Sequence, residues 1–567
     1  MFRERYVTIL IVVLLSALTL QVILIMKEKS VTADEMIFIK SGHQYLKTGN
    51  INIDDVNPPL IMIISALPLL FLNTTVETEI PPGVEELWFQ LYSYSQNPDQ
   101  ILFWARVPML LLSLMLALLV FRWARDFYGT KAGLLALSLY SFSPTIISLS
   151  GFATLDLGST FFIFLALYLF WKFLKNPSLG RLVIMCLSVG LAFSSKHTSL
   201  MLIPSFILLS FIVVFKGNFN LPATWPFFKK YGKNHKIIFW GTSSGILIII
   251  LVLTVNIVCG FNGTGIPLGD LPFVEKEVFK SHPLFSRLIN PYTDWIPIPL
   301  PYAYLRGIGS TIARTTMTHG FPSFLMGEIS PDGWWYYFLF AFAVKTPIPF
   351  LIAILFSIVL IKKSKNINWC DELFLAIPIG VMFIMASRSN AQMGIRHILV
   401  VYPLLFVFAS KLVQVDLKRK IITIICGIIL GIWYVYASIS VSPHYLSYFN
   451  EFVGGPKNGY RYLIDSNLDW GQDVKGLVKL MDRKGIDKIK FGHWIGIEPR
   501  YASRFEELGC EPTTGWVAIQ VNSLQGLTEA WGVLSPDCYA WLRKLEPVDR
   551  AGYSIFVYYI PTKPLSL

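Results

Sequence analysis

Two adjacent carboxylates stand just after the first long apolar run of the chain. Asp34 and Glu35 lie in "VTADEMIFIKSG", where an ionised side chain close to a bilayer loses part of its hydration. A positioned carboxylate can take the proton from a hydroxyl group and make it a nucleophile. Thr32 and Glu35 also fit the S/T-x-x-E pattern of a helix capping box. The pair therefore has both a catalytic and a structural interpretation.

A third carboxylate and several cations occupy comparable places. Asp156 lies in "SGFATLDLG", between two apolar segments. The basic residues, which lie near the ends of apolar segments or in the turns between them, are Arg106, Lys196, Lys345, Arg388, Arg396 and His397. Many cations with few carboxylates suit the binding and departure of a phosphate group on a lipid.

Each of these residues also has a structural explanation when it is taken alone. Lys196 can extend to the membrane surface, Arg106 can pair with a carboxylate, and Asp156 can cap a helix. Ionisable groups at membrane depth are costly, however, so their number favours a functional site. No Cys/His spacing indicates zinc and no D-x-D motif occurs. We expect no required cofactor, with a divalent metal as the alternative.

The elements that must position these side chains are membrane helices. The 567 residues are 54% hydrophobic and 15% charged, which is more apolar than a soluble fold of this length requires. Apolar runs of roughly 17 to 25 residues predict about eleven membrane spans. They lie near residues 6–26, 101–121, 132–149, 157–171, 182–195, 200–215, 237–259, 335–361, 373–386, 398–409 and 421–441.

Basic residues predict which side of the membrane each loop faces. Arg3 and Arg5 precede the first span and no A-x-A-like cleavage site follows it, which indicates a retained anchor with a cytoplasmic N-terminus. Every second loop is then rich in Lys and Arg, as the positive-inside rule expects. These loops lie near residues 122–131, 172–181, 229–236, 362–365 and 418–420. The net charge of +12 is thus explained without a nucleic-acid partner.

The same topology places residues 27–100, residues 260–334 and the chain after Ser442 outside. The first segment contains "PPLIMIISALPLLFL", which predicts a short helix at the membrane surface. Beyond Tyr460, "RYLIDS" and "KIKFGHWI" are typical of strands and flank the helical pattern "GQDVKGLVKLMDRKG". We predict a transmembrane domain over 1–441 and a small extracytoplasmic α/β domain over 442–567. Cys510 and Cys538 can form a disulfide there if the compartment is oxidising.

Several motifs together resemble the GT-C membrane glycosyltransferases that use polyprenyl-phosphate sugars. They resemble specifically the branch (glycosyltransferase family 39 type) that contains protein O-mannosyltransferases and lipid A aminoarabinose transferases. The resembling stretches, in the family's order, are "ADEMIFIKSG", "NPPL", "FWARVP", "GFATLDLGSTFFIFLALYLFWKFL", "GLAFSSKHTSLMLIPSF", "FAVKTPIPF" and "GIRHILVVYP". The resemblance implies a polytopic α-helical GT-C fold in the cell membrane.

The resemblance also implies roles for individual residues. Asp34 falls on the acidic position of the first external loop, which acts as catalytic base or orients the acceptor; Glu35 is its companion. Asp156 falls on the second acidic position, and Lys196 on a basic position that holds the carrier phosphate. We assign the same phosphate-binding role to the other basic residues, Arg106, Lys345, Arg388, Arg396 and His397. The chain departs from its relatives at Asn57, where His or Lys is common, and it lacks MIR-type domains.

These observations predict transfer of a sugar from a polyprenyl-phosphate donor to an acceptor hydroxyl. Attack assisted by a single base inverts the anomeric centre, and no second carboxylate is needed as a nucleophile. The acceptor is a protein in one branch of the resemblance and a glycolipid in the other. The alternative is a lipid or solute transporter, whose site should lie near the midplane on repeated, broken helices. A non-catalytic scaffold would leave the clustered charges unexplained.

Overall fold

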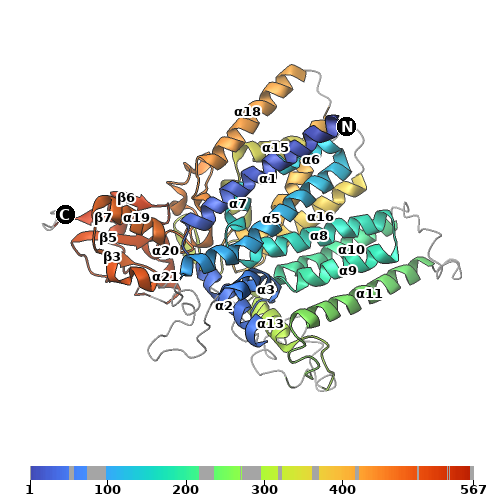
Figure 1. The fold of residues 1–567 in the computed structure, drawn as a ribbon, viewed down its shortest axis with the longest axis horizontal. Coiled ribbons are helices and arrows are strands. Elements are labelled where there is room, and N and C mark those ends of the chain that lie inside the picture. Colours follow the sequence, from blue (N-terminus) through green and yellow to red (C-terminus); the bar gives the residue numbers. More distant parts are fainter. Residues whose placement is uncertain are drawn as a thin grey trace.

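The structure of the protein is a computed structural model. It describes residues 2–49, 56–72, 97–215, 235–267, 270, 295–316, 322–359, 369–415, 420–494, 497–532, 534–535 and 537–561. Most of these residues are helical, and a small sheet stands at one end of a helical bundle (Figure 1). Of the five predicted basic loops, 362–365 lies outside the described residues, as do residues 229–234 of the loop 229–236 and residues 418–419 of the loop 418–420.

Each predicted span coincides, where it is described, with an apolar helix or a bent pair of helices. The helices are α1 (Phe2–Glu28), α5 (Pro98–Tyr128), α6 (Thr130–Ser141), α7 (Pro144–Ser150), α8 (Leu155–Lys175), α9 (Leu179–Phe193), α10 (Leu202–Phe215), α11 (His235–Val258), α14 (Tyr337–Lys345), α15 (Ile348–Val359), α16 (Trp369–Ser387), α17 (Val401–Ser410) and α18 (Lys420–Ile439). Among the described residues, 5 helices are long and apolar enough to cross a membrane, or up to 7 segments if each bent pair counts once. The number of eleven crossings stays a prediction.

Two predicted spans are broken at prolines. Helices α6 and α7 meet at 65° and α14 and α15 at 113°. Pro144 and Pro347 lie at these breaks, and proline has no amide hydrogen with which to continue a helix. The predicted spans 132–149 and 335–361 are therefore each a bent pair of helices and not one continuous helix. The sharper bend ends α14 at Lys345, a residue treated below.

Shorter helices lie in the segments between the spans. They are α2 (Ala33–Thr48), α3 (Leu60–Ala66), the 3-10 helix η1 (Leu67–Phe71) and α13 (Tyr302–Thr316). Helix α2 ends at Gly49, whose φ of 71° is the left-handed conformation that glycine tolerates, and its amide donates to the Tyr45 carbonyl at 2.8 Å. Helix α3 and η1 occupy the predicted surface helix, with Leu67, Leu70 and Phe71 exposed. A hairpin of β1 (Ser323–Leu325) and β2 (Glu328–Ser330) follows α13.

The C-terminal part forms a five-stranded mixed sheet in the order β4-β3-β5-β7-β6. The strands are β3 (Ile489–Gly492), β4 (Phe505–Glu507), β5 (Gly515–Gln520), β6 (Asp549–Ala551) and β7 (Ile555–Ile560), accompanied by helices α19 (Val474–Lys484), α20 (Val521–Leu524) and α21 (Leu527–Ala530). A disulfide joins Cys510 and Cys538. The strand predicted for "RYLIDS" was wrong, because Leu463 and Ile464 are buried in the core that the bundle shares with the sheet, and 3-10 turns replace the strand.

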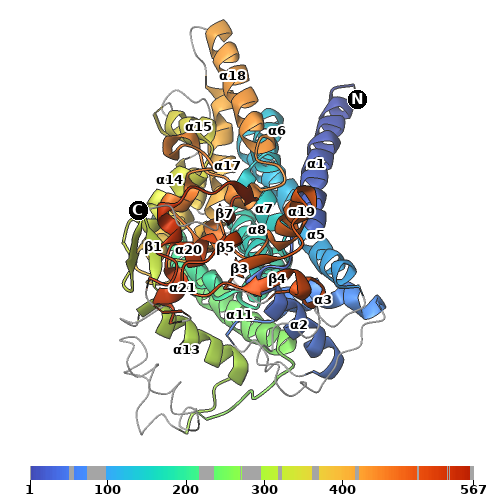
Figure 2. The same ribbon diagram turned by 90° about the vertical axis from the view of Figure 1, so that its left-hand side faces the viewer.

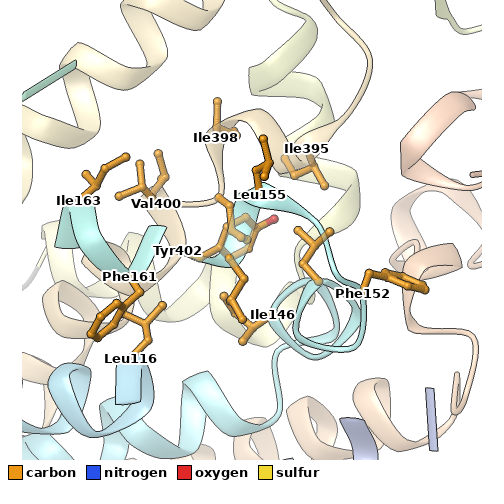
Figure 3. Packing of buried hydrophobic residues seen from close by; sticks show 14 of the residues in the cluster. Leu116, Ile146, Phe152, Leu155, Phe161, Ile163, Ile395, Ile398, Val400 and Tyr402 are labelled. Atoms are coloured by element: carbon orange, nitrogen blue, oxygen red, sulfur yellow. The ribbon is translucent and has the colours of Figure 1, made fainter. Parts of the chain in front are cut away.

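One hydrophobic core runs from the helices into the sheet. It includes Trp123 in α5, Trp470 before α19, and Ile519 and Phe556 in the sheet. A second cluster, with Leu477, packs α19 on the other side of the sheet. Figure 2 looks at the molecule from the sheet side, with the bundle behind the sheet. In Figure 3, Leu155, Ile395 and Ile398 gather in one part of the core, so the residues beside them in the chain are held at one place.

Candidate active site

Glu35 is fully buried and completes the predicted capping box. The Glu35 amide donates to the Thr32 hydroxyl at 3.4 Å, and the Thr32 amide donates to Glu35 Oε2 at 2.9 Å. Glu35 Oε1 also accepts a hydrogen bond from the Ala153 amide at 2.7 Å. The capping prediction is confirmed. Its carboxylate is fully buried and bonded within the fold, so the observed role of Glu35 is structural, and its catalytic role stays a prediction.

Arg106 is fully buried opposite Glu35. Its Nε and Nη2 each donate to a Glu35 oxygen at 2.7 Å, which makes a bidentate ion pair. Its remaining hydrogens go to the carbonyl oxygens of Met26, Lys29 and Ser30 at 2.8 to 3.2 Å. A guanidinium group has five N–H donors, and all five are used here. All donor hydrogens of Arg106 are thus engaged within the protein, and its role in phosphate binding stays a prediction.

Lys345 is buried at the end of α14. Its ammonium donates to the carbonyl oxygens of Leu446 and Asn467 at 2.7 and 2.6 Å. The ring of Phe449 lies 4.2 Å from the same nitrogen. These contacts tie the bent helix pair to the chain that follows α18. Lys345 thus joins parts of the fold, and its contact with the donor phosphate stays a prediction.

Four other predicted site residues form one ion-pair cluster. Arg396, in the 3-10 helix η6 (Ile395–Ile398), donates from Nη1 to Asp34 Oδ2 at 2.5 Å. The same nitrogen lies 3.7 Å from Asp156 Oδ2. Lys196, just before the 3-10 helix η2 (His197–Met201), donates to Asp156 Oδ1 at 2.6 Å. The structure thus brings both predicted acidic positions together with two of the predicted cations.

The two carboxylates of this cluster differ in their access to solvent. The Asp34 side chain is 26% exposed, whereas that of Asp156 is 1% exposed and stands in the first turn of α8. A helix N-terminus favours an ionised carboxylate, and Lys196 and Arg396 add two positive charges beside Asp156. Arg396 Nη2 makes no hydrogen bond to any described residue. Asp34 is therefore the more accessible carboxylate of the cluster.

The remaining predicted cations have contrasting surroundings. Arg388 is exposed beyond the end of α16 and has no side-chain partner among the described residues. His397 lies beside the cluster, where burial first and then the charges of Lys196 and Arg396 hold its pKa well below the usual range. Its Nε2 is buried without a hydrogen-bond partner in the described part of the chain. This direction disfavours the charged form, and the assignment of His397 as a phosphate-binding cation stays a prediction.

The C-terminal part contributes side chains that our sequence analysis missed. Ser466 Oγ accepts a hydrogen bond from Arg396 Nε at 3.0 Å, and the Trp470 ring centroid lies 4.4 Å from Arg396 Cζ. Asp465 is near the same guanidinium, and burial raises the pKa of its carboxyl group to about 7 despite that charge. The available signal was "DSNLDWGQD", in which aspartates recur every four residues after the last span.

Among the described residues, no group of three or more His, Cys, Asp or Glu side chains is arranged to hold a metal ion. An apolar cavity of about 480 Å³ lies between α8, α9, α10 and α11. Its lining includes Phe193 and Leu202, which flank Lys196 in the chain. The charged cluster and this cavity are the features from which a function can be proposed.

Comparison with known proteins places these features in context. The fold is similar over 97% of this chain and 97% of the other to ArnT from Cupriavidus metallidurans bound to undecaprenyl phosphate, with 12% identity and a TM-score of 0.46. It is also similar over 98% of this chain and 75% of the other to the oligosaccharyltransferase AglB from Archaeoglobus fulgidus, in complex with an inhibitory peptide and a dolichol-phosphate, with 11% identity and a TM-score of 0.44. No curated protein matches the chain.

A family model gives a further match. Residues 99–228 match the family described as dolichyl-phosphate-mannose-protein mannosyltransferase. This stretch contains Asp156 and Lys196 of the charged cluster, and it overlaps three of the motifs on which the resemblance was based. The chain therefore resembles the GT-C membrane glycosyltransferases, as its sequence motifs predicted.

Proposed function

We propose that this protein transfers a sugar from a polyprenyl-phosphate donor to an acceptor hydroxyl at the extracytoplasmic face of the cell membrane. One observation carries the proposal: the partly exposed carboxylate of Asp34 lies in one cluster with Asp156, Lys196 and Arg396. A carboxylate is what an acceptor hydroxyl needs, and cations are what a departing phosphate needs. The match of residues 99–228 to a mannosyltransferase family supports this reading.

Asp34 is the proposed general base. Its Oδ2 is held by Arg396, whereas no described residue donates a side-chain hydrogen bond to its Oδ1. A carboxylate fixed through one oxygen presents the other in a defined direction, which favours proton transfer in a positioned complex. Asp156 is nearly inaccessible and contacts two cations, so its proposed role is to hold Lys196 and Arg396 in place.

The proposed contacts to the donor phosphate come from three cations. Arg388 is exposed and lacks a partner among the described residues, and Arg396 keeps its Nη2 without one. Lys196 is partly exposed and contacts Asp156, which also lies beside Arg396. A lipid phosphate is a weakly basic leaving group, so fixed positive charges stabilise its departure without a general acid.

The hydrocarbon part of the carrier is proposed to enter the apolar cavity between α8 and α11. The lining is made of aromatic and aliphatic side chains with a few serines. Lys196 lies in the turn between the two lining helices α9 and α10. A lipid whose chain occupies the cavity would therefore carry its phosphate toward the charged cluster.

The proposed stereochemistry is inversion. A single base activates the acceptor for direct attack, so a β-linked carrier sugar gives an α-linked product. The acceptor is either a protein or a glycolipid. Mass spectrometry of surface proteins and lipids from cells with and without the protein tests both acceptors, and a sugar that disappears with the protein identifies the product.

The proposed outer location of the site can be tested by cysteine labelling. Lys488 is well exposed on the C-terminal part, so a Lys488→Cys variant should react with a membrane-impermeant maleimide in intact cells. The unmodified protein, whose Cys426 is exposed on α18, is the control for background labelling. Labelling of the variant only after the inner face is opened would overturn the topology and the proposed extracytoplasmic transfer.

A further inference from the structure

The segment Asp465–Asp473 lies between two parts of the charged site that are far apart in the sequence. The Ala33 amide donates to the Trp470 carbonyl at 3.1 Å, directly beside Asp34. The Ile395 amide donates to Asn467 Oδ1 at 2.9 Å, directly beside Arg396. Backbone groups next to the two paired charges are therefore both bonded to this one segment.

Internal hydrogen bonds hold this segment in shape. The Asp469 carboxylate accepts from the amides of Gly471 and Asn522 at 3.3 and 3.1 Å. The Asn522 side chain returns a bond to the Asp469 carbonyl at 3.0 Å and accepts one from the Asp465 amide at 2.8 Å. Since Asn522 lies in α20, the helix that follows β5, the sheet supports the segment.

Two side chains of the segment contact Arg396 directly. Ser466 Oγ accepts from Arg396 Nε and donates to the Met393 carbonyl at 2.5 Å, so the hydroxyl group is fixed from both sides. The buried Trp470 ring lies against the guanidinium group of Arg396. It also makes an edge contact with the Phe152 ring, with 6.1 Å between the two ring centroids. Phe152 belongs to the loop before Asp156. Trp470 therefore fills the space between Arg396 and the loop of the second carboxylate.

We propose that Ser466 and Trp470 are positioning residues that fix Arg396 between Asp34 and Asp156, so that the C-terminal part completes the active site. The inference rests on the proposed function. A free arginine side chain samples many rotamers, and it can orient the base only if its guanidinium group is held. The hydrogen bond to Nε and the aromatic face each remove part of that freedom. Without them Arg396 still neutralises charge but no longer directs Asp34.

The test uses the full-length protein in nanodiscs with a polyprenyl-phosphate sugar as donor. Trp470→Leu should lower kcat about 10- to 100-fold, because a displacement of about 1 Å in a reacting group has effects of that size. Ser466→Ala should lower kcat about tenfold, as expected for loss of one charge-assisted hydrogen bond. Both variants should leave the KM for the donor nearly unchanged. Trp470→Phe keeps an aromatic face and should restore most of the rate.

The matched control is Trp516→Leu, which removes a tryptophan that packs on Tyr559 within the sheet. It should keep the wild-type kcat, and unfolding midpoints compare the folding of all variants. If Trp470→Leu does not fold, Ser466→Ala decides the question, and a wild-type kcat in that variant alone overturns the inference. Wild-type kcat in both Ser466→Ala and Trp470→Leu, in an enzyme that Asp34→Asn inactivates, would overturn the inference. Full activity of Asp34→Asn would instead overturn the proposed function.

Discussion

Asp34 and Glu35 are neighbours in the sequence and opposites in the structure. Glu35 is fully buried, and its two oxygens accept hydrogen bonds from Arg106, the Thr32 amide and the Ala153 amide. Asp34 keeps about a quarter of its side chain exposed and pairs through one oxygen with Arg396. Successive helical residues point about 100° apart, so one faces the core and the other the open cluster. We call Glu35 with Arg106 the saturated pair and Asp34 with Arg396 the unsaturated pair. The saturated pair stabilises the fold, and the unsaturated pair keeps polar atoms available for the proposed chemistry.

The largest expected effect comes from breaking the saturated pair. Arg106→Met leaves the Glu35 carboxylate buried without a cation, which should cost about 3–5 kcal/mol of unfolding free energy. Denaturant or thermal unfolding in detergent measures it. The double variant Glu35→Gln/Arg106→Met is the control, since it leaves no buried charge and should recover part of the loss. An Arg106→Met protein as stable as the wild type would show that this pair does not hold the fold.

The unsaturated pair should behave in the opposite way. Asp34→Asn keeps the shape of the side chain but removes its basicity, so turnover should fall about 10²-fold or more while the unfolding midpoint stays close to wild type. Single-turnover assays with a lipid-phosphate sugar measure the rate. Asp156→Asn is the comparison, because it tests the other carboxylate of the cluster. Loss of turnover in that variant alone would assign the base to Asp156.

Replacement of the exposed Arg388 should weaken donor binding by a smaller factor than Asp34→Asn slows turnover. Arg388→Ala should weaken the binding of a short-chain polyprenyl phosphate about tenfold, as expected for loss of one charge-assisted contact. Titration calorimetry at two salt concentrations measures the affinity and its electrostatic part. Arg461→Ala, at an exposed arginine in the C-terminal part, is the control. Equal affinities in the two variants would exclude Arg388 from the phosphate site.

The capping residue provides a finer test of the contrast between the two carboxylates. Thr32→Ala removes the hydroxyl group that accepts from the Glu35 amide, so the unfolding free energy should fall by about 1 kcal/mol. The kcat should stay near the wild-type value, because Asp34 does not take part in the capping box. Thr32→Ser keeps the hydroxyl and should restore stability. A large loss of kcat with unchanged stability would instead link the cap to the chemistry.

The last expected effect is a pH dependence of stability. Burial raises the pKa of the Asp469 carboxyl group to about 7. The folded state therefore holds this proton more tightly than the unfolded state, and the stability so gained is complete below about pH 4 and is lost as the pH rises through 7. The unfolding midpoint of the wild-type protein should fall between about pH 5 and about pH 8. The fall over the same range should be smaller in Asp469→Asn. Asp332 is exposed, so the Asp332→Asn variant should show the same fall as the wild type. An equal fall in Asp469→Asn and Asp332→Asn would contradict the assignment of this pH dependence to Asp469.

The sequence predicted elements better than it predicted partners. The capping box of Thr32 and Glu35 is a pattern within one helical turn, and it was confirmed. The apolar runs likewise marked the positions of the helices. The sequence could not predict which arginine pairs with Asp34 and which with Glu35. Arg106 and Arg396 have the same chemistry, and both lie near the ends of apolar segments. The break after Lys345 was signalled by Pro347, although its angle was not.

What the sequence by itself determined is a polytopic helical chain with a capped α2 and with charged residues concentrated near helix ends, because apolar runs and caps depend on residues within a few positions of one another. Only the tertiary structure decided which charges meet. Arg106 pairs with Glu35 at a sequence separation of 71 residues, and Arg396 pairs with Asp34 at a separation of 362 residues. Trp470 of the C-terminal part packs against Arg396. Such pairings depend on how helices pack and bend, since burial and distance, and not residue type, select between equivalent charges.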